Sequence, residues 1–471
     1  MQIRSIAFAA LAAVSGQVFA LTPAQVADAS TVKVYMSGAS ASRAIIGGLF
    51  TENCSTDLDT YHSAIGTFGG VAFTAVGDAH RVYTCTMKAT SPILAGKKVA
   101  LFKSDIGGSG QGVFPVFFQT ARSFLTTSSC GTRAATAPNY TCTGEQSQVP
   151  MAGTSDVEPG LFKGVNVPTD DPTYPQDGLD DSQLAQLDTQ PVFQTVFGVA
   201  VNKALRNAMQ TAQGLSSGSD LAADIPSISL AQASSYFAGA LSAPADGLGW
   251  QALVSTSDTK KASRVNVCRR VPDSGTQAAA NAYLLTLPCN ASATAPADKG
   301  FSDAGLANAV ASVGPAGNIF VFEGSSTGNV ISCLGAAEDK AAYAIGHVSK
   351  ENDDTTAANS KWRHVKIDGI EPSRDNLKAG KYNYFYETTL QWHKDLYTTL
   401  STDQQDFLTA FRTQASVPAS LTKLASATQK GIAALPGSYA GAYGTGTADE
   451  INFGSRVSRG GNSCAVPTFY K

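Results

Sequence analysis

The sequence is poor in charged residues. They make up 15% of its 471 residues, against about 25% in a typical globular protein. Apolar residues make up 43%, so the chain has enough of them for ordinary cores and is not disordered on this ground. The formal net charge of −3 argues against a general nucleic-acid binder, because such proteins concentrate positive charge against phosphates. A single local anion pocket is still compatible with this composition.

Long apolar runs are also missing. Ile6–Val14 is about nine residues long, whereas a transmembrane helix needs about 20. This run follows Arg4 and precedes Val18-Phe19-Ala20, the small-x-small pattern of a signal-peptidase site. We therefore predict that residues 1–20 are a cleaved signal peptide. No cysteine lies near the cleavage point to carry a lipid, so the mature chain is expected to be periplasmic or secreted.

The chain lacks the ligand spacing of a zinc site, since no CxxC and no HxxxH pair occurs. We expect no metal and no cofactor. Signatures of hydrolases are incomplete. Asp273–Thr276 fits half of an aspartic-protease site, which needs two such carboxylates. The S-x-x-K matches at Ser257–Lys260 and Ser420–Lys423 have no companion motifs. We therefore predict a protein that is not an enzyme and has no catalytic residues.

An even number of cysteines in an exported chain favours disulfides. The eight cysteines permit many pairings, so connectivity stays open. The simplest hypothesis joins neighbours as Cys54–Cys85, Cys130–Cys142 and Cys268–Cys289, and leaves Cys333 with Cys464. Residues 126–150 are rich in Ser, Thr and Pro and are expected to form a surface loop clipped by the second of these bonds.

Strand-like and helix-like stretches alternate, which favours an α/β fold. Strands are expected at 31–36, 98–103, 194–202, 263–270, 318–322 and 342–348, and helices at 41–50, 229–240 and 277–285. Two or three further helices are expected between Tyr386 and Leu435, followed by an irregular tail. No internal repeat of 20–50 residues is visible.

Three turns of Gly and Ser are candidates for binding an anion. Ser37–Ser42 and Ser274–Thr276 each lie between an expected strand and a helix, and Gly107–Gly112 is the third. The free N–H groups at a helix N-terminus favour anions, and a Ser or Thr cap adds a hydroxyl group. One such turn would be an ordinary cap, but three could hold one oxyanion together.

Two charged positions fit an oxyanion site. Arg269 and Arg270 run directly into Ser274, and a guanidinium beside such a cap can bind the same oxyanion. Strand alternation sends the two arginines to opposite faces, so we expect one to bind and the other to be solvated. Asp156 fits only if the ligand carries a proton. An ionised carboxylate accepts a hydrogen bond from P–OH but repels a fully deprotonated oxyanion.

Four segments, in order, resemble the motifs of the periplasmic phosphate-binding proteins of ABC phosphate transporters. They are Ser37–Ser42 (SGASAS, similar to TGAGAT), Ile106–Val113 (IGGSGQGV, similar to IGSSGGV with one extra residue), Gly153–Asp156 (GTSD, similar to GASD) and Arg270–Thr276 (similar to R-x-x-x-S-G-T). Weaker matches lie at 194–202, 229–240 and 343–348.

The resemblance implies an α/β, two-domain type II periplasmic binding protein fold, with mixed sheets flanked by helices and a ligand cleft between the domains. Domain I would comprise 31–200 and 346–471, with the disulfide-bearing insertion at about 126–150, and domain II would comprise 201–345. The implied phosphate contacts come from Ser42, Ser109, Asp156, Arg270, Ser274, Gly275 and Thr276. Arg43, where the family usually has Phe, is an additional candidate.

The implied function is extracytoplasmic binding of inorganic phosphate or a related oxyanion by a monomer, for uptake through an ABC transporter permease. Two alternatives stay open. One is a secreted or surface protein that uses this scaffold to bind a partner, and the other is a secreted phosphomonoesterase. The long segment between the second and third motifs bears on docking to a transporter more than on ligand binding.

Overall fold

The computed structural model describes residues 21–63, 67–68, 71–72, 80–133, 139–169, 174–242, 249–298, 300–302, 312–314, 318–352, 360–425, 429–437 and 446–470. The predicted signal peptide lies outside the described residues. Within these ranges, no helix has the length and apolar character needed to cross a membrane.

A mixed sheet of 14 strands is the backbone of the fold. Its strands are β1 (Val32–Gly38), β2 (Asp59–Ser63), β5 (His80–Thr86), β6 (Lys98–Ser104), β8 (Asn139–Cys142), β10 (Ala152–Ser155), β11 (Leu187–Asn202), β13 (Val265–Arg270), β14 (Phe301–Ser302), β15 (Ile319–Gly324), β16 (Ala344–Ser349), β17 (Trp362–His364), β19 (Phe385–His393) and β20 (Ile432–Ala434). The order is β14-β15-β13-β16-β11-β19-β10-β1-β6-β5-β2-β8, and β17 and β20 also pair with β11.

Two stretches of this sheet have the same local order. In the β1 half, β1 pairs in parallel with β6 and β10, and β10 pairs with antiparallel β19. In the β13 half, β13 pairs in parallel with β15 and β16, and β16 pairs with antiparallel β11. The first strand of each trio leads into a helix, as crossovers between parallel strands require. These helices are α2 (Arg43–Glu52) and α7 (Gly275–Leu284).

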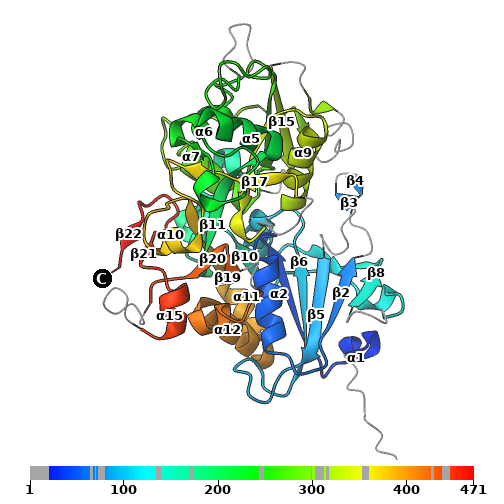
Figure 1. Ribbon diagram of the computed structural model, residues 1–471. Coiled ribbons are helices and arrows are strands. Elements are labelled where there is room, and N and C mark those ends of the chain that lie inside the picture. The colour runs from blue at the N-terminus through cyan, green and yellow to red at the C-terminus, as the bar shows by residue number, and fades with distance from the viewer. Residues whose placement is uncertain are drawn as a thin grey trace, which may run out of the picture.

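Strand β11 joins the two halves. Its residues 187–196 pair with β19, and its residues 197–201 pair with β16. Figure 1 shows the β13 half above the β1 half, with β11 between them. The assignment of residues 31–200 plus 346–471 and of residues 201–345 to separate domains stays a prediction.

Helices pack on the sheet through apolar side chains. In the β1 half, α2 and α12 (Thr402–Ser416) contribute Phe50 and Phe407 to a core shared with Val34. In the β13 half, neighbouring residues of β15 face opposite sides. Val321 belongs to the core of α7 and α6 (Leu230–Phe237), and Phe320 belongs to the core of α9 (Thr327–Asp339). The expected α/β class, with mixed sheets flanked by helices, is confirmed.

All eight cysteines form disulfides. The bonds are Cys54–Cys85, Cys130–Cys142, Cys268–Cys333 and Cys289–Cys464. The first two expected pairs are confirmed, and the other two are wrong. Cys268 lies on β13 in the core shared with α9, which carries Cys333, whereas α7 carries the chain away before Cys289. The packing of α9 against β13 therefore decides this disulfide pairing more than proximity in sequence does.

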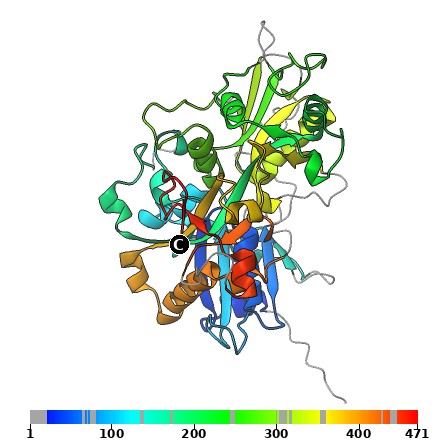
Figure 2. The same ribbon diagram turned by 60° about the vertical axis from the view of Figure 1, so that its left-hand side comes forward.

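Two expected irregular segments contain regular structure. Within 126–150, β8 pairs with β2 at the end of the main sheet, and β9 (Glu145–Gln148) pairs with β7 (Arg122–Leu125). Residues 134–138 lie outside the described residues. The tail contains α15 (Ala448–Phe453) and a small sheet of β21 (Val457–Ser458) and β22 (Thr468–Phe469). In Figure 2, the end of this red tail lies at the level where the two halves meet.

Candidate anion-binding site

The first predicted turn follows β1. Gly38 has φ +105°, and a Cβ there would lie 2.1 Å from the Thr154 carbonyl oxygen, so only glycine fits. The next amide, of Ala39, donates to that oxygen at 2.9 Å. Ser42 precedes α2, and its Oγ donates to the Ala39 oxygen at 3.1 Å and contacts Thr154 Oγ1 at 3.4 Å. These contacts hold the turn against the end of β10, two residues before Asp156.

The second turn follows β6 and contains Ser109. Gly107 and Gly108 have φ +82° and +98°, the left-handed region that glycine tolerates best. Ser109 begins the short 3-10 helix η1 (Ser109–Gly112) and is fully buried. Its Oγ accepts the amide N–H of Asp156 at 3.1 Å. The second and third predicted segments are thus in direct contact.

Asp156 is a buried carboxylate with unused acceptor capacity. Its Oδ2 accepts from Thr276 Oγ1 at 3.3 Å, and its Oδ1 is buried without a hydrogen-bond partner. Burial raises the pKa of Asp156 to about 6, although the charge of Arg270 and the hydroxyl groups of Ser109 and Thr276 act in the opposite direction. Near neutral pH the site therefore contains an ionised carboxylate with one oxygen free to accept a hydrogen bond.

The N-terminus of α7 brings the fourth predicted segment against the second and third. Ser274 caps this helix and accepts the Gln277 amide at 3.4 Å. A Cβ on Gly275 would lie 2.3 Å from Ser109 Oγ and 2.8 Å from Asp156 Cβ. Glycine therefore permits the close approach of α7 to the β1 half at this position.

Arg270 ends β13 with a buried guanidinium. Its Nε donates to the Gly324 carbonyl at 3.1 Å and its Nη2 to the Ser325 carbonyl at 2.7 Å. Its Nη1 reaches Thr327 Oγ1 at 3.4 Å and, across to the β1 half, Ser40 Oγ at 3.3 Å. The fixed side chain therefore places a positive charge where the two halves meet.

Further hydrogen bonds connect the β1 half and the β13 half beside Arg270. The Gly110 amide donates to the Asp273 carbonyl at 2.8 Å, and Gln111 Nε2 donates to the Asp273 carboxylate. A Cβ on Gly110 would lie 1.5 Å from Asp273 Oδ1, so a larger residue there would displace the Asp273 side chain. These bonds join η1 of the β1 half to the turn that precedes α7.

The structure brings the predicted site residues together in one buried region, which we call the candidate site. Six of their side chains are 0–2% exposed, and Gly275 is also buried. The seven residues are Ser42, Ser109, Asp156, Arg270, Ser274, Gly275 and Thr276. Their role as ligands stays a prediction.

Arg43 belongs to an ion-pair network beside the candidate site. Its Nε donates to Asp105 Oδ2 at 2.6 Å, and the buried Lys103 donates to Asp105 Oδ1 at 2.6 Å and to the Gly38 carbonyl at 2.9 Å. Burial alone would raise the pKa of Asp105, but Lys103 and Arg43 together hold it below its usual value. Two cations around one carboxylate leave a local excess of positive charge.

The expectation that one of the two adjacent arginines is solvated is wrong. Arg269 is buried, and its Nη2 forms an ion pair with Glu323 Oε1 at 2.8 Å. Alternation does separate Arg269 from Arg270, but β15 pairs with β13 and brings Glu323 opposite Arg269. The Arg269 guanidinium is therefore paired with Glu323 on the neighbouring strand and is not solvated.

Sequence reasoning missed two buried groups near the candidate site. His347 Nε2 lies 2.9 Å from Gln277 Oε1, which also accepts the Arg270 amide. Burial, aided by Arg270, lowers the pKa of His347 to about 3, so this ring is neutral. Glu351 follows β16, and burial raises its pKa to about 8, with Asp156 among the contributing charges. Their only sequence signal is their position at and after an expected strand.

The chemistry that these groups support is binding. The candidate site offers hydroxyl groups, a helix N-terminus, one guanidinium and one carboxylate. In the described part of the chain, no group of three His, Cys, Asp or Glu side chains could hold a metal ion. A tetrahedral oxyanion needs several donors and a balancing charge, which these residues provide.

The chain was compared with known proteins by sequence and by structure. No protein-family model matches the sequence, and no curated protein matches it significantly. Solved structures do match. One from Clostridium perfringens, assigned as a phosphate ABC transporter substrate-binding protein with bound phosphate, is 12% identical, with a TM-score of 0.44 over 85% of this chain and 99% of that chain.

A phosphate-binding protein from Stenotrophomonas maltophilia is 12% identical, with a TM-score of 0.37 over 82% of this chain and 90% of that chain. An ABC-type phosphate transport receptor from Vibrio cholerae is 11% identical, with a TM-score of 0.31 over 56% of this chain and 74% of that chain. At this level of similarity no neighbour's ligand is transferred to this chain. The names of these solved structures agree with the family that the four motifs resemble: two are described as phosphate transport proteins and one as a phosphate-binding protein.

Proposed function

We propose that the chain binds inorganic phosphate in the candidate site, as a protonated oxyanion and without chemistry. The observation that carries the proposal is Asp156 Oδ1, a buried acceptor with no hydrogen-bond partner. Leaving such a group unpaired costs about 1–3 kcal/mol. A P–OH group supplies the missing hydrogen, and Arg270 at the end of β13 balances the charge of the ligand.

Each residue of the candidate site has a distinct role in this proposal. Arg270 neutralises the oxyanion, and Asp156 accepts a hydrogen bond from its P–OH group. The donors are hydroxyl groups and the backbone at the start of α7, contributed by Ser42, Ser109, Ser274, Gly275 and Thr276. Arg43 and Lys103 add positive potential through their network with Asp105.

The same arrangement separates phosphate from sulfate. Sulfate has no O–H group at neutral pH and cannot donate a hydrogen bond to Asp156. A negative sulfate oxygen would therefore face the negative carboxylate oxygen in a buried site. That repulsion and the unpaired acceptor both weaken sulfate binding. Below about pH 6 Asp156 is protonated more often and can donate, so the discrimination should decline there.

We further propose that the protein works outside the cytoplasm as a monomer and delivers phosphate to an ABC transporter permease. Residues 1–20 would direct its export. The candidate site is buried, so a ligand can enter only if the β1 half and the β13 half move apart. Closure over the ligand would then distinguish the loaded form for the transporter.

Titration calorimetry of the mature chain with inorganic phosphate tests this function. We expect one binding site and about tenfold weaker binding in Thr276→Val, because one hydrogen bond to a charged ligand is lost. Thr413→Val, at an exposed position of α12, is the matched control and should bind as the wild type does.

Three outcomes would contradict the proposal. Folded protein that gives no heat with phosphate would favour a partner-binding role for the scaffold. Turnover of a chromogenic phosphate ester by the wild type, abolished in Asp156→Ala, would favour a phosphomonoesterase. Equal phosphate affinities of Thr276→Val and the wild type would remove Thr276 from the site.

A further inference from the structure

A cavity of about 370 Å³ is lined by residues outside the candidate site. We call it the basic cavity. Its basic lining residues are Arg206, Lys350, Arg363, Arg374 and Lys430, and its acidic ones are Asp220, Glu371 and Asp375. Five cations against three carboxylates leave an excess of two positive charges.

Elements of both halves contribute to the basic cavity. Arg206 lies on α5 (Lys203–Ala212), which follows β11, and Arg363 lies on β17, which pairs with β11 at residues 200–202. Arg374 begins α10 (Arg374–Lys378), and Lys430 precedes β20, which pairs with β11 at residues 193–195. The lining therefore extends along β11 from the β13 half to the β1 half.

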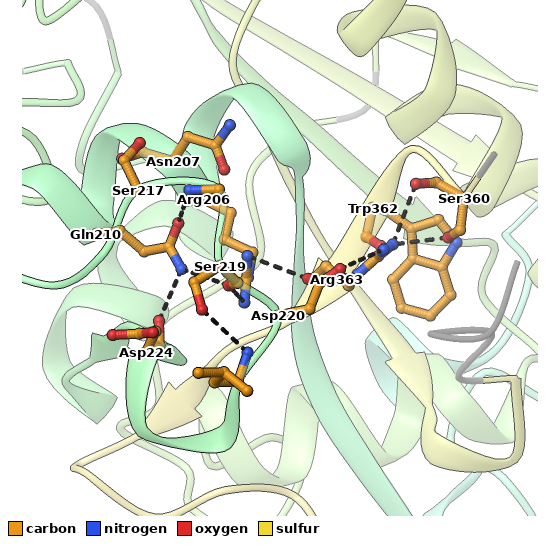
Figure 3. Close-up of polar contacts among 12 residues, drawn as sticks. Arg206, Asn207, Gln210, Ser217, Ser219, Asp220, Asp224, Ser360, Trp362 and Arg363 are labelled. Carbon is orange, nitrogen blue, oxygen red and sulfur yellow. Dashed lines mark hydrogen bonds and ion pairs between the residues drawn. The ribbon is translucent and has the colours of Figure 1, made fainter. Parts of the chain in front are cut away.

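Two buried arginines share one aspartate in the basic cavity, as Figure 3 shows. Arg363 donates to Asp220 through Nε at 3.1 Å and Nη2 at 3.0 Å, and Arg206 Nη1 lies 3.3 Å from Asp220 Oδ1. The arginine side chains are 2% and 6% exposed, whereas that of Asp220 is 47% exposed. The two buried guanidinium groups therefore share a carboxylate that is itself half exposed, and Asp224 adds only a weaker attraction for Arg206.

Arg206 also has a donor without an acceptor. Its Nη2 donates to the Ser219 carbonyl at 2.6 Å, but its buried Nε has no hydrogen-bond partner. Burial lowers the pKa of Arg206, and the charge of Arg363 lowers it further. A buried cation with an unpaired donor is costly, so this position favours an additional acceptor of negative charge.

Arg374 also lines the basic cavity, and it too has a buried donor without a hydrogen-bond partner. Its Nε is buried without a partner, while its Nη1 donates to the Gln429 carbonyl at 2.9 Å. Its guanidinium also lies 4.1 Å from the ring centroid of Phe453. By contrast, the neighbouring Asp375 side chain is 85% exposed and lies 3.8 Å from Lys378. Cations thus dominate the interior, and this carboxylate faces solvent.

We propose that the basic cavity is a second anion-binding site, which takes a compact polyanion carrying at least two negative charges. The excess of two cations in the lining matches a ligand with at least two negative charges. The unpaired Nε donors of Arg206 and Arg374 favour a ligand with oxygen acceptors. Phosphoryl and carboxylate groups share this chemistry, since both accept planar hydrogen bonds from guanidinium groups. The cavity volume leaves room for more than one such group.

Titration calorimetry at low ionic strength, with inorganic pyrophosphate in one series and citrate in another, tests the proposal. The series is run without added inorganic phosphate, which as a dianion would compete for the basic cavity, and is repeated in Arg270→Ala, in which the candidate site is disabled. We expect one site for at least one probe, with its affinity retained in Arg270→Ala. Phosphate binding can thus fail while polyanion binding persists, which keeps the two proposals distinguishable.

Variants locate the binding site. We expect about tenfold weaker binding in Arg206→Gln, because a charge-assisted hydrogen bond is lost. Lys430→Gln, at an exposed position that leaves the core intact, should weaken binding about threefold by loss of one screened charge. Lys381→Gln, also exposed, is the matched control and should leave the affinity unchanged.

Thermal unfolding gives an independent measurement. A ligand of the folded state raises the unfolding temperature by an amount that grows with the logarithm of its concentration relative to Kd, so the active probe should stabilise the wild type more than Lys430→Gln. The proposal is overturned if neither probe binds. It is equally overturned if the affinities of Arg206→Gln and Lys430→Gln match that of Lys381→Gln, since the arginine cluster would then be purely structural.

Discussion

The candidate site and the basic cavity concentrate positive charge in different ways. The candidate site combines Arg270 with hydroxyl groups, a helix N-terminus and the unpaired acceptor of Asp156. The basic cavity has five cations and three carboxylates, with its aspartates largely toward solvent. An acceptor inside an anion site selects for a bound proton, whereas a surplus of cations selects only for total charge. The first site is therefore suited to one chemical species and the second to a class of ligands.

Removal of the Arg270 guanidinium should have the largest effect on anion binding in this comparison. We expect Arg270→Ala to weaken phosphate binding about hundredfold or more, because truncating a buried charge partner costs several kcal/mol. Binding of the polyanion probe should be unchanged. Calorimetry with both ligands on the same preparation measures the two effects, and Arg122→Ala on β7 serves as the control.

Arg270→Lys separates charge from geometry. It keeps the cation but loses the fork that spans Ser325 and Ser40. Phosphate affinity between those of the wild type and Arg270→Ala is expected. A wild-type phosphate affinity in Arg270→Ala, or equal losses for both ligands, would abolish the distinction between the two sites.

The pH dependence of stability should differ between carboxylates of the two sites. Burial raises the pKa of Asp156 from 3.8 to about 6, so the folded protein holds this proton more tightly than the unfolded chain does. The ionised form therefore destabilises the unliganded fold increasingly from about pH 4 to about pH 6. Relative to the wild type, Asp156→Asn should gain unfolding temperature across that interval, by an amount equivalent to a few kcal/mol.

Asp220 in the basic cavity should show the opposite sign. Its hydrogen bonds with Arg363 lower its pKa, so its ionised form stabilises the fold above pH 4, and this stabilisation is lost at lower pH. Relative to the wild type, Asp220→Asn should lose unfolding temperature at neutral pH. Unfolding scans in phosphate-free buffer measure both differences, and contributions from His347 cancel in them. If the unfolding temperatures of Asp156→Asn and Asp220→Asn changed with pH in the same direction relative to the wild type, the opposite pKa shifts assigned to these two carboxylates would be contradicted.

Much of the fold and three of the turns could be predicted because their signals are local. The cap at Ser274, where Oγ accepts the Gln277 amide, is the arrangement that a Ser between strand and helix favours. Alternating strand and helix patterns likewise predict an α/β fold. The meeting of Ser109, Asp156 and Gly275 has no local signal, because these residues are far apart in sequence. It was expected only from the order of the four motifs.

Other features depend on pairing across the sheet and could not be predicted. Arg269 is adjacent to an exposed-looking turn, yet the register of β13 and β15 places Glu323 beside it. Glu351 lies in a polar stretch that suggests a surface, but the fold half-buries it and encloses its Oε2 atom. Arg206 and Lys430 of the basic cavity are more than 200 residues apart in sequence. Long-range packing decides all these positions, and no residue spacing encodes it.

The most direct test of the central claim is a comparison of phosphate and sulfate affinities at pH 8 by titration calorimetry, in the wild type and in Asp156→Asn. At this pH the carboxylate of Asp156 is ionised, since its pKa is about 6. We predict that the wild type binds phosphate and strongly disfavours sulfate, and that Asp156→Asn narrows the difference about tenfold or more, as expected when an unpaired or repulsive buried contact is relieved. Equal affinities of the wild type for the two anions, or unchanged selectivity in Asp156→Asn, would contradict the account.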